Sequence, residues 1–169
     1  MRLILLGCAV LLLAFVGSGV SQESTPPATT PAPAATHMLI APGDLKWGDP
    51  PPIFEKGAAF TVVSGDPSQP GLFVVRLKMP AGYKIAPHWH PADEHVTVIK
   101  GTFSLGMGDK FDKTSMKTLP DGSYALLPAD MRHYAMAKTA VVVQVHGQGP
   151  FALTYVNPED DPSKRTPAK

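Results

Sequence analysis

Short apolar or alternating runs, separated by turn residues, dominate the chain between about residue 44 and residue 158. Glycine and proline recur too often along this region for long amphipathic helices. Many short strands at this spacing, with turns such as Pro120-Asp121-Gly122 between them, favour an antiparallel sandwich or barrel. The pattern therefore predicts an all-β domain with strands at Ala58–Val63, Leu72–Met79, Lys84–Trp89, His95–Ile99, Thr102–Met107, Ser123–Leu127, His133–Ala137, Val141–Val145 and Phe151–Val156.

This domain, residues 44–158, has flanking segments of different composition. Residues 22–43 consist mostly of proline, alanine, threonine and serine, and they are poor in the large apolar side chains that offset the entropy of ordering. We therefore predict a disordered linker there, which is either a tether for the domain or a leader of no specific role. Residues 159–169 are charged and poor in apolar side chains, so they are predicted to be a disordered tail.

The N-terminal residues 1–21 have the pattern of a secretory signal peptide. Arg2 precedes an apolar run, Leu3–Val16, and small residues follow up to a cleavage point before Gln22. The run is short for a membrane span of about 20 residues, although an uncleaved anchor is the alternative. We expect an exported protein, periplasmic or extracellular, with no membrane span after cleavage.

Composition narrows the classes of partner. Cys8 is the only cysteine, so a mature chain that begins at Gln22 can form no disulfide. A lipid anchor on Cys8 is an open alternative, but most of the apolar run follows this residue instead of preceding it. Without Arg2 the chain has equal numbers of basic and acidic residues, and this balance gives no reason to expect nucleic acid as a partner.

One stretch, Gly82–Gly101, concentrates the candidate chemistry. It contains His88, His90 and Glu94. Side chains alternate between the two faces of a strand, so the parity of these three positions places them on the same side. Two imidazoles and a carboxylate on one face are a suitable ligand set for a divalent transition metal.

The spacing of this stretch resembles the first conserved motif of the cupin superfamily: Gly82-x5-His88-x-His90-x3-Glu94-x6-Gly101. A later stretch resembles the second cupin motif: Gly122-x5-Pro128-x-Asp130-x2-His133-x3-Ala137. In the second motif Asp130 replaces a turn glycine and Ala137 replaces an asparagine. Neither position carries a ligand in the family, and aspartate tolerates an unusual turn backbone better than most residues do.

The resemblance implies a cupin-type jelly-roll β-barrel with a metal inside it. His133 would join the ligands of the first motif and complete the set His88, His90, Glu94 and His133. The cofactor would be one divalent transition metal ion, such as Fe, Mn, Zn, Ni or Cu. Four protein ligands around an octahedral ion leave two positions for water, dioxygen or substrate.

Two further residues are candidates for substrate binding or for contacts behind the metal ligands. Gln144 and His146 share one face of their predicted strand, and valines occupy the other face. They would contact the site if their face points into the barrel, whereas the alternative is a half-exposed position on the polar face. His95 has the opposite parity to Glu94 and is expected to point away from the metal.

Activity is the least specific part of the resemblance, because cupins carry many unrelated functions. The resemblance favours a metal-dependent, dioxygenase-like oxidoreductase that acts on a small oxygen-rich molecule. The alternative is a non-catalytic cupin that binds a metal or a small ligand. Cupins often form homodimers through an outer sheet face, and no sequence feature here decides the oligomeric state.

Overall fold

A computed structural model describes residues 37–165 of the chain. The predicted signal peptide, and the predicted linker up to residue 36, lie outside the described residues. Residues 37–43 are exposed and have no strand structure. Within residues 37–165, no helix has both the length and the apolar character needed to cross a membrane.

The described region is built from ten strands. Nine of them correspond to the predicted strands, so the prediction of an all-β domain is confirmed. The strands are β1 (Ala59–Ser64), β2 (Gly71–Met79), β3 (Lys84–Trp89), β4 (Glu94–Lys100), β5 (Phe103–Met107), β6 (Lys117–Leu119), β7 (Tyr124–Leu127), β8 (His133–Ala137), β9 (Val141–Gly149) and β10 (Thr154–Tyr155).

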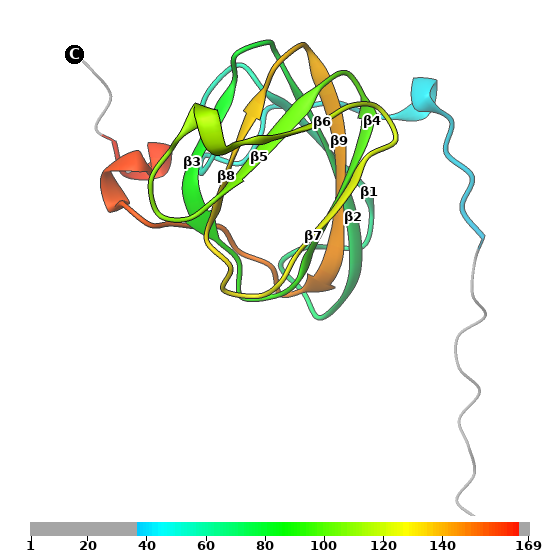
Figure 1. Cartoon of the computed structure of the whole chain (residues 1–169). Coiled ribbons are helices and arrows are strands. Elements are labelled where there is room, and N and C mark those ends of the chain that lie inside the picture. The colour runs from blue at the N-terminus through cyan, green and yellow to red at the C-terminus, as the bar shows by residue number, and fades with distance from the viewer. Residues whose placement is uncertain (1–36, 166–169) are drawn as a thin grey trace, which may run out of the picture. The chain divides into compact units, whose positions relative to one another are not determined.

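The strands form two five-stranded sheets, in the orders β1-β2-β9-β4-β7 and β10-β3-β8-β5-β6. All pairings between these strands are antiparallel. The two sheets face each other across the barrel, with β9, β2 and β4 on one side and β3, β8 and β5 on the other (Figure 1). This arrangement is the jelly-roll architecture that the resemblance to cupins implied.

The prediction missed β6 and overextended β10. Only Leu119 of β6 is buried, and three residues are too few to show an alternating pattern. The predicted strand Phe151–Val156 pairs with β3 only at Thr154 and Tyr155, whereas its first residues form a loop that lines the cavity. Phe151 and Leu153 in this loop are partly buried against the core, so the apolar run marked contact with the core without marking a strand.

Alternation decides which side chains fill the interior. Along β2, the buried residues Phe73, Val75, Leu77 and Met79 alternate with more exposed ones. In β9, Val141, Val143 and Val145 are buried in the same way. Both strands lie inside the first sheet, so their apolar faces line the barrel interior.

The C-terminal segment is more ordered than predicted. Residues 158–164 contain two short 3₁₀ helices, η3 (Pro158–Asp160) and η4 (Pro162–Lys164). The side chain of Asp161 is buried and accepts a hydrogen bond from the Ser163 amide at 2.9 Å. Arg165 forms an ion pair with Glu55, which precedes β1. The prediction of a disordered tail is therefore wrong for residues 159–165, because local capping and this distant ion pair hold the segment.

A close contact between the neighbouring strands β5 and β8 yields a stability prediction. Gly106 lies opposite Tyr134, and a Cβ atom at position 106 would overlap the aromatic ring. Tyr134 is 1% exposed and its hydroxyl bonds to Ser115 Oγ at 2.7 Å, so the ring has little freedom to move. Gly106→Ala is expected to lower the free energy of unfolding by about 1–3 kcal/mol in urea titrations.

The matched control is Gly48→Ala. A Cβ atom at position 48 would meet no atom within 4 Å, so this variant should stay within about 0.5 kcal/mol of the unsubstituted protein. Equal unfolding midpoints for the two variants would show that the Tyr134 ring has room to give way.

Candidate metal centre

Three strand ends bring four polar side chains together inside the barrel. His88 lies near the end of β3, and His90 follows one residue after that strand. Glu94 is the first residue of β4, and His133 is the first residue of β8. His88 and His133 are direct partners across the β3–β8 pair. All four are at most 8% exposed, although such residues are rarely buried without a compensating partner.

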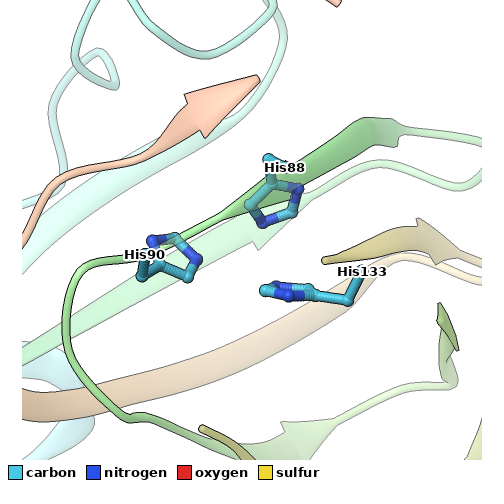
Figure 2. A group of neighbouring side chains, drawn as sticks. All are labelled: His88, His90 and His133. Atoms are coloured by element: carbon cyan, nitrogen blue, oxygen red, sulfur yellow. The ribbon is translucent and has the colours of Figure 1, made fainter. Parts of the chain in front are cut away.

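The three imidazoles converge. One nitrogen from each of His88, His90 and His133 lies within 4.8 Å of the others. Figure 2 shows the three rings directed toward a common centre from the β3 region and from β8. A transition metal bonds imidazole nitrogen at about 2.1 Å, which places ligand atoms up to about 4.2 Å apart, so the cluster is close to a ligating spacing.

Backbone carbonyl groups orient each ring. The Nδ1 atom of His88 lies 2.7 Å from the Ala86 oxygen, that of His90 lies 2.8 Å from the Ala152 oxygen, and that of His133 lies 2.9 Å from the Met131 oxygen. A carbonyl oxygen can only accept, so each Nδ1 must carry the proton and donate it. In a neutral imidazole of this tautomer, the remaining nitrogen, Nε2, presents a lone pair, which is the form that binds a metal.

Glu94 adds negative charge to this cluster. Its Oε2 atom lies 3.5 Å from His90 Nε2 and 3.3 Å from His133 Nε2. Burial alone would raise the pKa of Glu94, but the two adjacent histidines outweigh burial and hold that pKa below its ordinary value. The buried side chain is therefore a carboxylate that needs positive charge beside it.

Among the four candidate ligands, His88 is the residue whose surroundings most clearly favour the uncharged form. Burial, together with the neighbouring His133 and His90, lowers the pKa of His88 to about 3. Its imidazole is therefore uncharged near neutral pH. An uncharged imidazole beside a carboxylate is the protonation state that metal binding requires.

These observations test whether the residues fit a metal ion. Within the described region, His90 Nε2 is buried and has no hydrogen-bond partner. It also lies beside a carboxylate oxygen, and two atoms that both present lone pairs repel each other unless a proton or a cation lies between them. A divalent ion would satisfy both groups, so the cluster can bind a metal, and the chemistry of the donor set fits a transition metal.

The turn before β8 has the backbone that the sequence indicated. Asp130 has a φ of 62°, in the left-handed region, where the second cupin motif has glycine. Its amide donates to the His90 carbonyl oxygen at 2.8 Å. The turn therefore links the loop after β3 to the start of β8, and it places His133 beside His90.

A cavity of about 350 Å³ adjoins the four polar residues. Its other walls are aliphatic and aromatic, with residues from both sheets and from three loop segments: the one before β1, the one between β1 and β2, and the one between β9 and β10. Phe151 stacks on the His90 ring, with centroids 4.3 Å apart and ring planes at 17°. Sequence reasoning did not identify Phe151 as a site residue, because it lies in a loop that only the tertiary structure brings over His90.

Gln144 and His146 do not line this cavity. In β9 the valine face points inward, and Gln144 lies on the outer side, where its side-chain oxygen accepts from Arg76 Nε at 3.0 Å. His146 stacks on His95, with centroids 4.7 Å apart, and both residues line a separate pocket. In the structure, Gln144 and His146 thus occupy half-exposed positions on the polar face of β9, which was the alternative to a place in the site. The signal was present in the sequence, because an all-valine face is the more favourable one to bury.

His95 points away from the metal ligands, as its parity indicated. Its Nδ1 atom lies 2.6 Å from the Tyr124 hydroxyl on the outer side of the first sheet. His95 and His146 therefore form a second histidine pair that does not line the main cavity.

Comparison with known proteins places this geometry in context. The model of a family described as the ChrR cupin-like domain matches residues 35–152. No curated protein matches the sequence. Solved structures with a similar fold include a candidate acetylacetone dioxygenase from Methylibium petroleiphilum, with 20% identity, a TM-score of 0.60, and coverage of 79% of this chain and 90% of that one.

Two other structures share the fold at lower identity. An acetylacetone dioxygenase from Acinetobacter johnsonii has 15% identity and a TM-score of 0.58, and the match covers 79% of this chain and 86% of that one. The polyketide cyclase RemF from Streptomyces resistomycificus has 14% identity and a TM-score of 0.63, with coverage of 76% and 92%. At these sequence identities the similarity shows a shared fold alone.

Proposed function

Because the chain belongs to the ChrR cupin-like family of the cupin superfamily, we propose that it is a metal-dependent, dioxygenase-like oxidoreductase that acts on a small molecule. The observation that carries the proposal is the set of three buried imidazoles, each oriented by a backbone carbonyl, beside a carboxylate. The residues that would hold the metal are His88, His90, Glu94 and His133. When bound, such a metal acts as a Lewis acid toward substrate oxygen atoms and exchanges electrons with dioxygen.

The residues of the chain orient the candidate ligands and set the charge and polarity around them. The three carbonyl contacts hold the imidazoles before a metal arrives, so little ordering entropy is lost on binding. Glu94 offsets one of the two positive charges of a divalent ion, and a charge of one remains for an anionic substrate oxygen. The apolar walls exclude water, which strengthens electrostatic interactions inside the cavity.

Oxygen chemistry is supported by the likeness in fold to two proteins named as acetylacetone dioxygenases, one of them a candidate. The test is oxygen uptake by the protein loaded separately with Fe(II), Mn(II), Cu(II) or Zn(II), with small phenols, diketones and carboxylic acids as substrates. We expect uptake with a redox-active metal, none with zinc, and none after His88→Ala. The control His95→Ala, outside the cavity, should leave uptake unchanged, and ligand binding without turnover for every metal would overturn the enzymatic proposal.

A second candidate function is a non-catalytic ligand-binding cupin. The observation in its favour is that, among the described residues lining the cavity, only the four candidate ligands can titrate. Tyr83 lies nearby, but its hydroxyl donates to the Glu55 carbonyl oxygen at 2.7 Å, and burial together with Glu55 raises its pKa to about 12. A site without a separate acid or base suits binding as well as it suits metal-centred chemistry.

We also propose that the protein is exported, on the basis of residues 1–21 alone. N-terminal sequencing of the mature protein, purified from the extracytoplasmic fraction of its host, should begin at Gln22. An intact Met1 in that fraction would contradict cleavage.

A further inference from the structure

We infer that the molecule taken by this cavity has one oxygen-bearing end that chelates the metal and an uncharged, apolar body. The inference rests on the metal centre proposed above and names the class of substrate for that same site. It narrows the sequence-based expectation, which was a small oxygen-rich molecule without further specification.

Polar groups are unevenly distributed along the cavity. The polar side chains of its lining are His88, His90, Glu94 and His133, and they gather at one place. Among the lining residues that the structure describes, none is lysine, arginine, serine, threonine, asparagine or glutamine. A ligand group beyond the metal centre would therefore find no side chain to donate or accept a hydrogen bond.

The register of the first sheet places apolar residues side by side along the cavity wall. Val96 follows Glu94 by two residues on the inner face of β4. It pairs with Val145 of β9, which in turn pairs with Val75 of β2. The next inward residues of β2 and β9, Leu77 and Val143, also pair with each other. The cavity wall beside Glu94 is therefore continuously apolar.

The opposite sheet repeats this arrangement. Ala135 follows His133 by two residues on β8, and it pairs with Leu105 of β5 on one side and Ile85 of β3 on the other. All three residues line the cavity. On both walls, therefore, the next inward-facing residue after a candidate metal ligand is already a hydrocarbon side chain.

The cost of burying polar groups selects between classes of ligand. A hydroxyl group that is buried without a partner loses its hydrogen bonds to water, and a buried carboxylate without a cation loses far more. Sugars and polycarboxylic acids carry such groups along their whole length, so they fit poorly. A small ring or alkyl body with a single pair of adjacent oxygens can satisfy the metal at one end and the apolar walls elsewhere.

The test uses three catechols that share one chelating head: 4-methylcatechol, 3,4-dihydroxybenzyl alcohol and 3,4-dihydroxybenzoate. Binding to the full chain loaded with redox-inert zinc is measured by calorimetry, and each affinity is divided by that of the same catechol for zinc alone. We expect the methyl compound to bind about 10-fold more tightly than the alcohol and at least about 100-fold more tightly than the carboxylate.

A pair of wall variants sharpens the test. Val145→Thr places a hydroxyl group in the cavity wall, and it should reduce the preference for 4-methylcatechol over the alcohol. Val142→Thr makes the same change on β9, at a position outside the cavity lining, and it should leave the preference unchanged.

The outcomes separate the two proposals. Zinc-dependent binding with normalised affinities within about threefold of one another would overturn the apolar class and leave the metal centre standing. If none of the three catechols shows zinc-dependent binding, the proposed metal centre fails as a ligand site and the inference falls with it.

Discussion

Replacing His88, His90 or His133 by alanine is expected to reduce metal affinity at least about 100-fold, because changes to groups that merely orient metal ligands already cost about 10–100-fold. Each of these imidazoles presents an Nε2 lone pair to the same centre, and its Nδ1 proton is held by a carbonyl oxygen. Elemental analysis of protein purified without added metal should show the loss directly. The triple variant should retain no metal.

The outer histidines provide matched controls for this experiment. His95→Ala and His146→Ala remove the same side chain from positions outside the cavity lining, and both should leave metal content unchanged. Circular dichroism of each variant checks that the fold survives the substitution. Metal content that persists in the folded triple variant would refute the assignment of the site.

Removing the metal is expected to lower the unfolding temperature by about 10–20 °C when the ion is present at about a thousand times its dissociation constant. The proposed ligands include His88 and His133, which the unfolded chain does not hold together. The ion therefore binds the folded state selectively, and it adds its binding free energy to stability. Calorimetric scans of chelator-treated protein, with and without zinc, measure the difference.

Two variants establish where this stabilisation originates. The shift should vanish in the triple histidine variant. Glu94→Gln keeps the size of the side chain but removes the charge that balances a divalent ion, so it should retain only part of the shift. An equal zinc-induced shift in the native protein and the triple variant would place the stabilising ion elsewhere.

The fold class could be predicted because alternation and turn residues are local signals. β2 and β9 were recognisable from apolar side chains at every second position, and the structure buries those positions. β6 could not be predicted, since three residues with one buried side chain carry no periodicity. The ordered segment at residues 159–165 was missed for another reason, because it depends on an ion pair between Arg165 and the distant Glu55.

The candidate site also has features that could be predicted from the sequence and features that could not. The spacing of His88, His90 and Glu94 placed them on one face, and the second motif identified His133 as their partner. The carbonyl groups that orient the rings could not be predicted, because any residue can supply a main-chain oxygen. Ala152, whose oxygen contacts His90, is 62 positions away in the chain. The sequence left open which face of β9 lines the barrel. In the structure the valine face lines it.

The sequence by itself therefore determined the type of fold and the positions of the polar side chains that can hold a metal. Strand periodicity and the spacing of His88, His90 and Glu94 are properties of neighbouring residues, so they can be identified along the chain, whereas the jelly roll and the place of His133 followed from the resemblance to the two cupin motifs. The tertiary structure alone decided what surrounds those side chains: the carbonyl contacts, Phe151 stacked on His90, and the hydrocarbon walls on both sheets. These features depend on which distant segments pack together, and the character of the ligand depends on them.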